Sequence, residues 1–191
     1  MNDKIQQNNL DKLRNIVASS GAIQSELILG ALKNPSLEFQ AEVFSLISNQ
    51  TNAARINPPL KMEDNLELIM TYLFRCISED PQVNDADPNE LIHSRWSATH
   101  ELSNWFAWLW KQYPNDRSEV EKIKNKIKLL YLNGDQNLRK AILQGILEHI
   151  FENAAVVEMF SDWTTSESDI RAAYDQALAW AQGGGHSFLW D

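Results

Sequence analysis

The stretch QNLRKAILQGILEHIFEN, residues 136–153, decides the fold of this 191-residue chain. Its apolar side chains recur at helical spacing on two neighbouring stripes, and polar residues mark one narrow wet side. A helix whose surface is apolar around most of its circumference packs between other helices. The stripes are Leu138, Ile142, Ile146 and Ile150, and Leu143, Leu147 and Phe151, with Gln144, Glu148 and Glu152 on the wet side. The sequence therefore predicts a helical core around this segment.

Helical periodicity continues on both sides of this central segment. Proline, glycine and asparagine at turn positions separate the apolar runs, and no alternating run is long enough to make a convincing strand. The expected helices cover residues 10–17, 22–32, 36–47, 66–77, 90–113, 118–131, 136–153, 154–162 and 167–182. We therefore predict an all-α fold, either a multi-helix bundle or a short α-solenoid of about eight helices.

The chain is expected to form one helical domain over residues 1–182. The polar stretch 49–62 has the composition of a connector, so an N-terminal helical subdomain 1–48 joined to a helical body 63–182 remains an alternative. Three glycines open residues 183–191 directly after a helix. They predict a hinged tail that either packs back on the body or inserts into a partner.

A weak internal echo relates two parts of the chain. The sequence LGALKNPSLEFQAEVFSLIS in the 30–48 region and LLYLNGDQNLRKAILQGILE at 129–148 share a layout at an offset of 100 residues, with Ala41 matched by Ala141. Each is a helix end, a polar turn and an apolar helix. This layout resembles the helix–turn–helix unit of HEAT-like repeats, although any helical hairpin has a similar one. A helical adaptor or scaffold is therefore the alternative function.

Charge is unevenly distributed along the chain, whose formal net charge is −9. Residues 62–110 hold nine acidic and two basic side chains, and residues 141–191 hold eight acidic and one basic. Residues 111–140 hold eight basic and four acidic side chains, interleaved as on the solvated face of a helix. An acidic surface repels nucleic acid and anionic lipid and attracts basic proteins. We therefore expect a protein partner and no nucleic acid.

Membrane insertion and secretion are not expected. The longest apolar stretches are far below the ~20 residues that a membrane span needs. The start, MNDKIQQNNL, has no apolar signal core, which predicts a cytoplasmic protein. Cys76, the one cysteine, excludes an intramolecular disulfide and a cysteine-rich zinc site, and its apolar surroundings in sequence predict that it is buried.

Histidines and carboxylates are the first candidates for chemistry. Glu90-x-x-His93 and His149-x-x-Glu152 have the i, i+3 spacing that places two metal ligands on one helix face. His149 falls on the apolar side of its helix, where a single hydrogen bond would satisfy it, and His93 lies two turns from His100. We favour core or rim histidines and expect no metal and no cofactor. An enzyme that uses these histidines with Glu90 is a remote alternative.

No other catalytic signature is present. The sequence contains no His-Glu-x-x-His motif, no Gly-x-Ser-x-Gly and no glycine-rich phosphate loop. These absences favour a function without catalysis.

Tryptophan is abundant, with seven residues in the chain. Trp96 and Trp108 lie off the core stripe of the helix expected at 90–113. Tryptophan is enriched at the energetic centres of protein interfaces, because a large rigid side chain gains burial at little entropy cost. The predicted partner-binding set is His93, Trp96, His100, Trp108, Glu148 and Glu152.

Residues 94–182 carry a resemblance to a known class of proteins. The relevant motifs are Trp-Ser-Ala-Thr-His-Glu-Leu at 96–102, Leu-Glu-His-Ile-Phe-Glu at 147–152, Phe-Ser-Asp-Trp at 160–163 and the stretch 174–180. Together they resemble small acidic all-helical bacterial proteins of the polymorphic-toxin immunity type. The resemblance covers about half of the chain, and its motifs are not catalytic signatures. It implies a non-enzymatic protein that neutralises a toxin by capping it; a basic toxin domain fits the acidic surface. The oligomeric state stays open.

Overall fold

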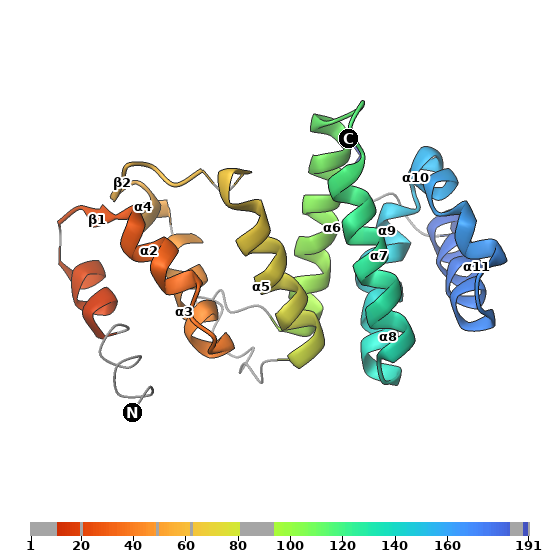
Figure 1. The fold of residues 1–191 in the computed structure, drawn as a ribbon, viewed down its shortest axis with the longest axis horizontal. Coiled ribbons are helices and arrows are strands. Elements are labelled where there is room, and N and C mark those ends of the chain that lie inside the picture. The colour runs from red at the N-terminus through yellow and green to blue at the C-terminus, as the bar shows by residue number, and fades with distance from the viewer. Residues whose placement is uncertain are drawn as a thin grey trace. The chain divides into compact units, whose positions relative to one another are not determined.

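The computed structural model describes residues 11–19, 21–48, 50–61, 63–80, 94–183 and 189–190. The fold is all-α, as the periodicity predicts, and eight of its described helices have seven or more residues (Figure 1). None of the helices in these ranges combines the length and the apolar composition that a membrane span requires.

Two compact units make up the chain. The first contains the described residues up to Cys76, with Asp80 and Ser94, and the second contains Ile77–Glu79 and the described residues from Arg95 onward. The elements of the first unit, after a helical stretch at 11–18, are β1 (Ile23–Gln24), α2 (Ser25–Leu32), α3 (Leu37–Ser48), α4 (Gln50–Ala53), β2 (Ile56–Asn57), η1 (Glu63–Asn65) and α5 (Leu66–Glu79), which runs into the second unit.

The turn between α2 and α3 follows its sequence signal. Pro35 cannot continue a helix, and Ser36 caps the next one, because its hydroxyl oxygen accepts a hydrogen bond from the Phe39 amide at 3.2 Å. The interior of this unit includes Phe44 and Tyr72, whose rings stack at 4.1 Å between centroids. Cys76 is fully buried, as predicted.

The stretch expected to be a connector folds into α4 and β2. β2 pairs in parallel with β1, so that Ile23 lies opposite Ile56. Arg55, just before β2, donates to carbonyl oxygens at the end of the helical stretch 11–18 and just beyond it. The acceptors are Ile16 and Val17 in the last turn and Ser19 and Gly21 after it. Helix ends leave carbonyls without partners, and one guanidinium with five donors satisfies several of them. The apolar periodicity of the sequence does not predict that Arg55 binds these carbonyls.

The second unit is built around the segment that opened the sequence analysis. Its elements are α6 (Arg95–Gln112), α7 (Ser118–Asn133), α8 (Gln136–Ile142), η2 (Leu143–Leu147), α9 (Glu148–Ile150), α10 (Ala154–Met159), η3 (Ser161–Thr165) and α11 (Ser168–Gly183). The run α8–η2–α9 packs against both α6 and α11. All seven apolar residues of its two predicted stripes are buried, which confirms the central placement.

The two hairpins of the internal echo differ in register. In α2–α3 the cap donor is the Phe39 amide, and in α7–α8 it is the Leu138 amide, which donates to the Asp135 carboxylate at 2.8 Å. These donors are 99 residues apart, whereas the match of Ala41 with Ala141 needs 100. A shift of one residue turns a helix by about 100°. Aligning the two hairpins by their caps therefore superposes different helix faces from aligning them by Ala41 and Ala141.

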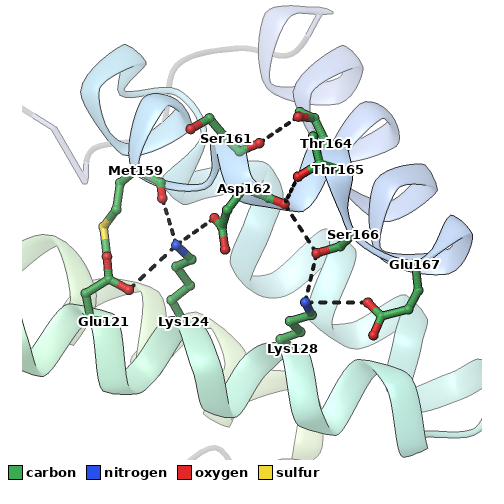
Figure 2. Close-up of polar contacts among 10 residues, drawn as sticks. All are labelled: Glu121, Lys124, Lys128, Met159, Ser161, Asp162, Thr164, Thr165, Ser166 and Glu167. Atoms are coloured by element: carbon green, nitrogen blue, oxygen red, sulfur yellow. Dashed lines mark hydrogen bonds and ion pairs between the residues drawn. The ribbon is translucent and has the colours of Figure 1, made fainter.

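Lys124 departs from the solvated face that its segment predicts. It is buried, and its Nζ lies 2.7 Å from Asp162 Oδ1 and donates to the Met159 carbonyl at 2.8 Å. One turn later, Lys128 Nζ donates to the hydroxyl of Ser166 at 2.8 Å. Figure 2 shows the two lysines of α7 reaching the same turn of chain. The α10–η3 turn supplies the oxygens that make burial of a lysine tolerable.

Candidate functional site

A wide helical turn stands at the centre of the candidate site. Residues Leu143–Leu147 form a π-helical segment between α8 and α9, where an uninterrupted α-helix was expected. An i→i+5 turn takes about one residue more than an α turn, so side chains after it lag by about 100°. The residues after η2 are therefore turned away from the positions that a regular helical wheel assigns to them.

Gly145 lies inside this wide turn and lets α6 come close. A Cβ at this position would lie 1.9 Å from Thr99 Oγ1 and 2.6 Å from Thr99 Cβ. The Gly145 carbonyl accepts a hydrogen bond from the hydroxyl of Ser103 at 2.7 Å, and both Thr99 and Ser103 are buried. The contact fixes α6 against η2 along one turn of each helix.

His100 and His149 meet across this contact. His100 lies one residue after Thr99 on α6, and His149 lies just beyond η2 in α9; their ring centroids are 5.0 Å apart. The sequence placed His149 with Ile142, which is fully buried, whereas His149 is half-buried. The hydrogen bond expected to satisfy it is absent: among the described residues, neither imidazole has a hydrogen-bond partner. The lag introduced by η2 explains the difference.

The pKa of His100 is lowered from its ordinary value. Burial disfavours the imidazolium, and the charge of His149 adds a smaller effect in the same direction. His100 is therefore neutral at pH 7, with one ring nitrogen carrying an available lone pair.

Two tryptophans contact the two histidines, one through a ring and one through the backbone. Trp96, one turn before His100, packs edge to face against it at 5.5 Å and remains 44% exposed. Trp190, from the tail, donates its indole N–H to the backbone carbonyl of His149 at 3.0 Å. This residue of the tail therefore packs back on the body, one of the two outcomes the sequence left open. We call Trp96, His100, His149 and Trp190 the imidazole–indole cluster.

The structure distributes the predicted partner-binding residues unevenly. Trp96 and His100 belong to the cluster, and the half-buried Glu148 and Glu152 lie within three residues of His149. Trp108 does not join them. It lies 12 residues beyond Trp96 on α6, which is about 18 Å at 1.5 Å per residue. His93 lies outside the described residues.

Trp108 belongs to a second aromatic group at the end of α6. Its ring packs edge to face with Trp105 at 5.5 Å and with Tyr113 at 6.0 Å, and Tyr113 is 48% exposed. Arg117, which directly precedes α7, places its guanidinium 3.6 Å above the ring of Trp110 on α6. These contacts leave Trp108 half-buried rather than fully presented to solvent.

Sequence reasoning considered His149 only as a remote candidate for metal or acid–base chemistry and left both His149 and Trp190 out of the partner-binding set. The available signal for His149 was Gly145, a glycine inside a strongly helical pattern, which usually marks a packing or functional requirement. Nothing in the sequence pattern places Trp190 beside His149.

Neither a search for metal-binding clusters nor comparison with known proteins assigns a function to this site. Within the described ranges, no group of three or more histidine, cysteine, aspartate or glutamate side chains is arranged to hold a metal ion. Comparisons with family models, curated proteins and solved structures find no match to this chain.

Proposed function

We propose that this chain is a non-enzymatic protein of the bacterial immunity type, which neutralises a toxin by capping it with an acidic, aromatic surface. The observation that carries the proposal is the exposure of Trp96. It presents 44% of its surface while the helix beneath it is held tightly through Thr99 and Ser103. A rigid, exposed indole has the properties of an interface hot spot, because little conformational entropy is lost when a partner buries it.

The charge around Trp96 favours a basic partner. The cluster combines side chains from residues 94–110, which hold one acidic and one basic residue, and from residues 141–190, which hold seven acidic residues and one basic residue. Glu101, Glu148 and Glu152 lie within three residues of its histidines in the sequence, and all three are partly exposed. Toxins that cleave nucleic acid need a basic surface for their substrate, and an acidic cap is attracted to that surface.

Co-expression with a toxin encoded beside this chain's own gene tests the proposal. The wild-type chain is expected to restore growth and to bind the purified toxin. Trp96→Ala is expected to weaken the Kd by about 30-fold, which corresponds to a hot spot of about 2 kcal/mol. Leu129→Ala is the matched control, since Leu129 is 54% exposed on α7, outside the cluster.

Two results would count against this function. The first is that the chain neither binds the toxin nor restores growth. The second is that Trp96→Ala and Leu129→Ala bind with the same Kd as wild type, which would place the interface elsewhere.

A further inference from the structure

We propose that His100 and His149 form a two-histidine site for a divalent transition-metal ion, for which Zn²⁺ is the representative. The site joins α6 to α9 and stands independently of the toxin-binding function. It rests on the spacing of the two rings, on their unpartnered nitrogens and on the turn that brings them together.

The spacing of the rings matches that of two imidazoles on one ion. With a Zn–N bond of about 2.1 Å and a ring centre about 1.1 Å behind the nitrogen, two imidazoles on a tetrahedral ion have centroids about 5 Å apart. The centroids of His100 and His149 are 5.0 Å apart.

The nitrogens of both rings are available for ligation. Neither imidazole is hydrogen-bonded to a described residue, although both are half-buried. No described group competes for these nitrogens, so each neutral ring keeps a lone pair for a ligand.

The backbone that positions the pair is fixed in advance. The π-helical turn Leu143–Leu147 rotates His149 out of the core, and the Gly145–Thr99 contact sets how close its helix lies to α6. π-turns inside α-helices are frequent at functional sites. A ligand pair held on two helices in close contact loses little freedom when an ion binds.

The donor set selects the kind of ion. Imidazole nitrogen suits Zn²⁺, Ni²⁺ and Cu²⁺, whereas Mg²⁺ and Ca²⁺ prefer oxygen ligands. Two protein ligands are fewer than the three of a typical catalytic zinc site. The remaining coordination positions are therefore open to water or to a side chain of a bound protein.

Calorimetric titration of the full chain, first stripped of metal, with ZnCl₂ alone tests the site. We expect one ion per chain, no heat with MgCl₂, and a rise in Tm of roughly 5 °C at an ion concentration 100 times the Kd. His100→Gln and His149→Gln should each weaken binding at least tenfold. The control is a double variant of the two remaining histidines, His93→Gln with His186→Gln, which should bind as wild type does.

A measurement on the wild-type chain guards against a variant that fails to fold. In ¹⁵N NMR spectra, Zn²⁺ should shift the imidazole nitrogens of His100 and His149. The proposal is overturned if Zn²⁺ does not bind, if both single variants bind as wild type does, if only the His93/His186 variant loses binding, or if the resonances of His100 and His149 do not move.

Discussion

Replacing Gly145 with alanine tests whether the close approach of α6 to η2 holds the second unit together. The new Cβ would lie 2.6 Å from Thr99 Cβ, where ordinary contacts between carbon atoms are about 3.5–4.0 Å. Thr99 Cβ is attached directly to the backbone of α6, so rotating its side chain does not remove this clash. The two helices must separate by about 1 Å to restore an ordinary contact.

The cost of this separation has three parts. Overpacking a tight interior costs about 1–3 kcal/mol. Moving α6 away also stretches the hydrogen bond from Ser103 to the Gly145 carbonyl, now 2.7 Å, which is worth about 1 kcal/mol. Against these, alanine is favoured over glycine in a helix by about 0.5–1 kcal/mol. We therefore expect Gly145→Ala to lower the free energy of unfolding by about 2 kcal/mol.

Urea unfolding followed by tryptophan fluorescence measures this change. All seven tryptophans lie between residues 96 and 190, so the signal reports on the second unit alone. The control is Gly30→Ala in α2, where a Cβ would meet no atom within 4 Å. Far-UV circular dichroism should show that this control is unchanged or stabilised by up to about 1 kcal/mol.

A compensating change on α6 separates the clash from other effects. Thr99→Gly removes the Cβ that Gly145→Ala would meet, so the double variant should recover at least about 1 kcal/mol relative to the sum of the single changes. Thr99→Ala should recover less, because it removes the hydroxyl contact and keeps the Cβ. The reasoning fails if Gly145→Ala is as stable as wild type, or if the two changes are simply additive.

Three further changes test other contacts. Lys124→Met should lower the free energy of unfolding by about 1–2 kcal/mol in the same fluorescence assay, because it removes the donor to the half-buried Met159 carbonyl. Lys122→Met removes an exposed ion pair and should cost under about 0.5 kcal/mol. The pKa of Glu38 is lowered, first by a backbone hydrogen bond and then by one from Ser36, so its charged form stabilises the fold above pH 4.5. Circular dichroism melts should show an advantage of wild type over Glu38→Gln at pH 7 that fades as the pH falls below 4.5; equal melts at pH 7 would contradict it. Arg55→Lys should destabilise the first unit by about 2 kcal/mol in far-UV circular dichroism, because an ammonium has three donors and no planar fork, and an unchanged melt would show that the carbonyl contacts contribute little.

The zinc and toxin experiments address different properties of the same surface. His100→Gln changes metal binding directly, whereas Trp96→Ala leaves both imidazoles in place. If the chain binds Zn²⁺ but binds no toxin, the proposed metal site stands and the proposed immunity function fails. Toxin binding that is unaffected by Zn²⁺, EDTA or His149→Gln would show that the two are separate.

Helix content and most of the core follow from the sequence by itself. Side chains three and four residues apart share a helix face, so the stripe through Leu138, Ile142 and Ile146 already requires burial. The caps at Ser36 and Asp135 are equally local, because each bonds an amide three residues ahead. These features depend only on neighbours along the chain.

Other features were decided only by the tertiary structure, because they depend on contacts between residues far apart in sequence. The wide turn at Leu143–Leu147 exists together with its contact to α6, and no local pattern states which turn of a helix will widen. That turn rotates His149 away from the core and places it beside His100, 49 residues earlier. The burial of Lys124 has the same origin, since its partners Met159 and Asp162 reach it only after the chain has turned back. Periodicity assigns a side chain to a face of its own helix, but the packing of other helices determines what that face meets.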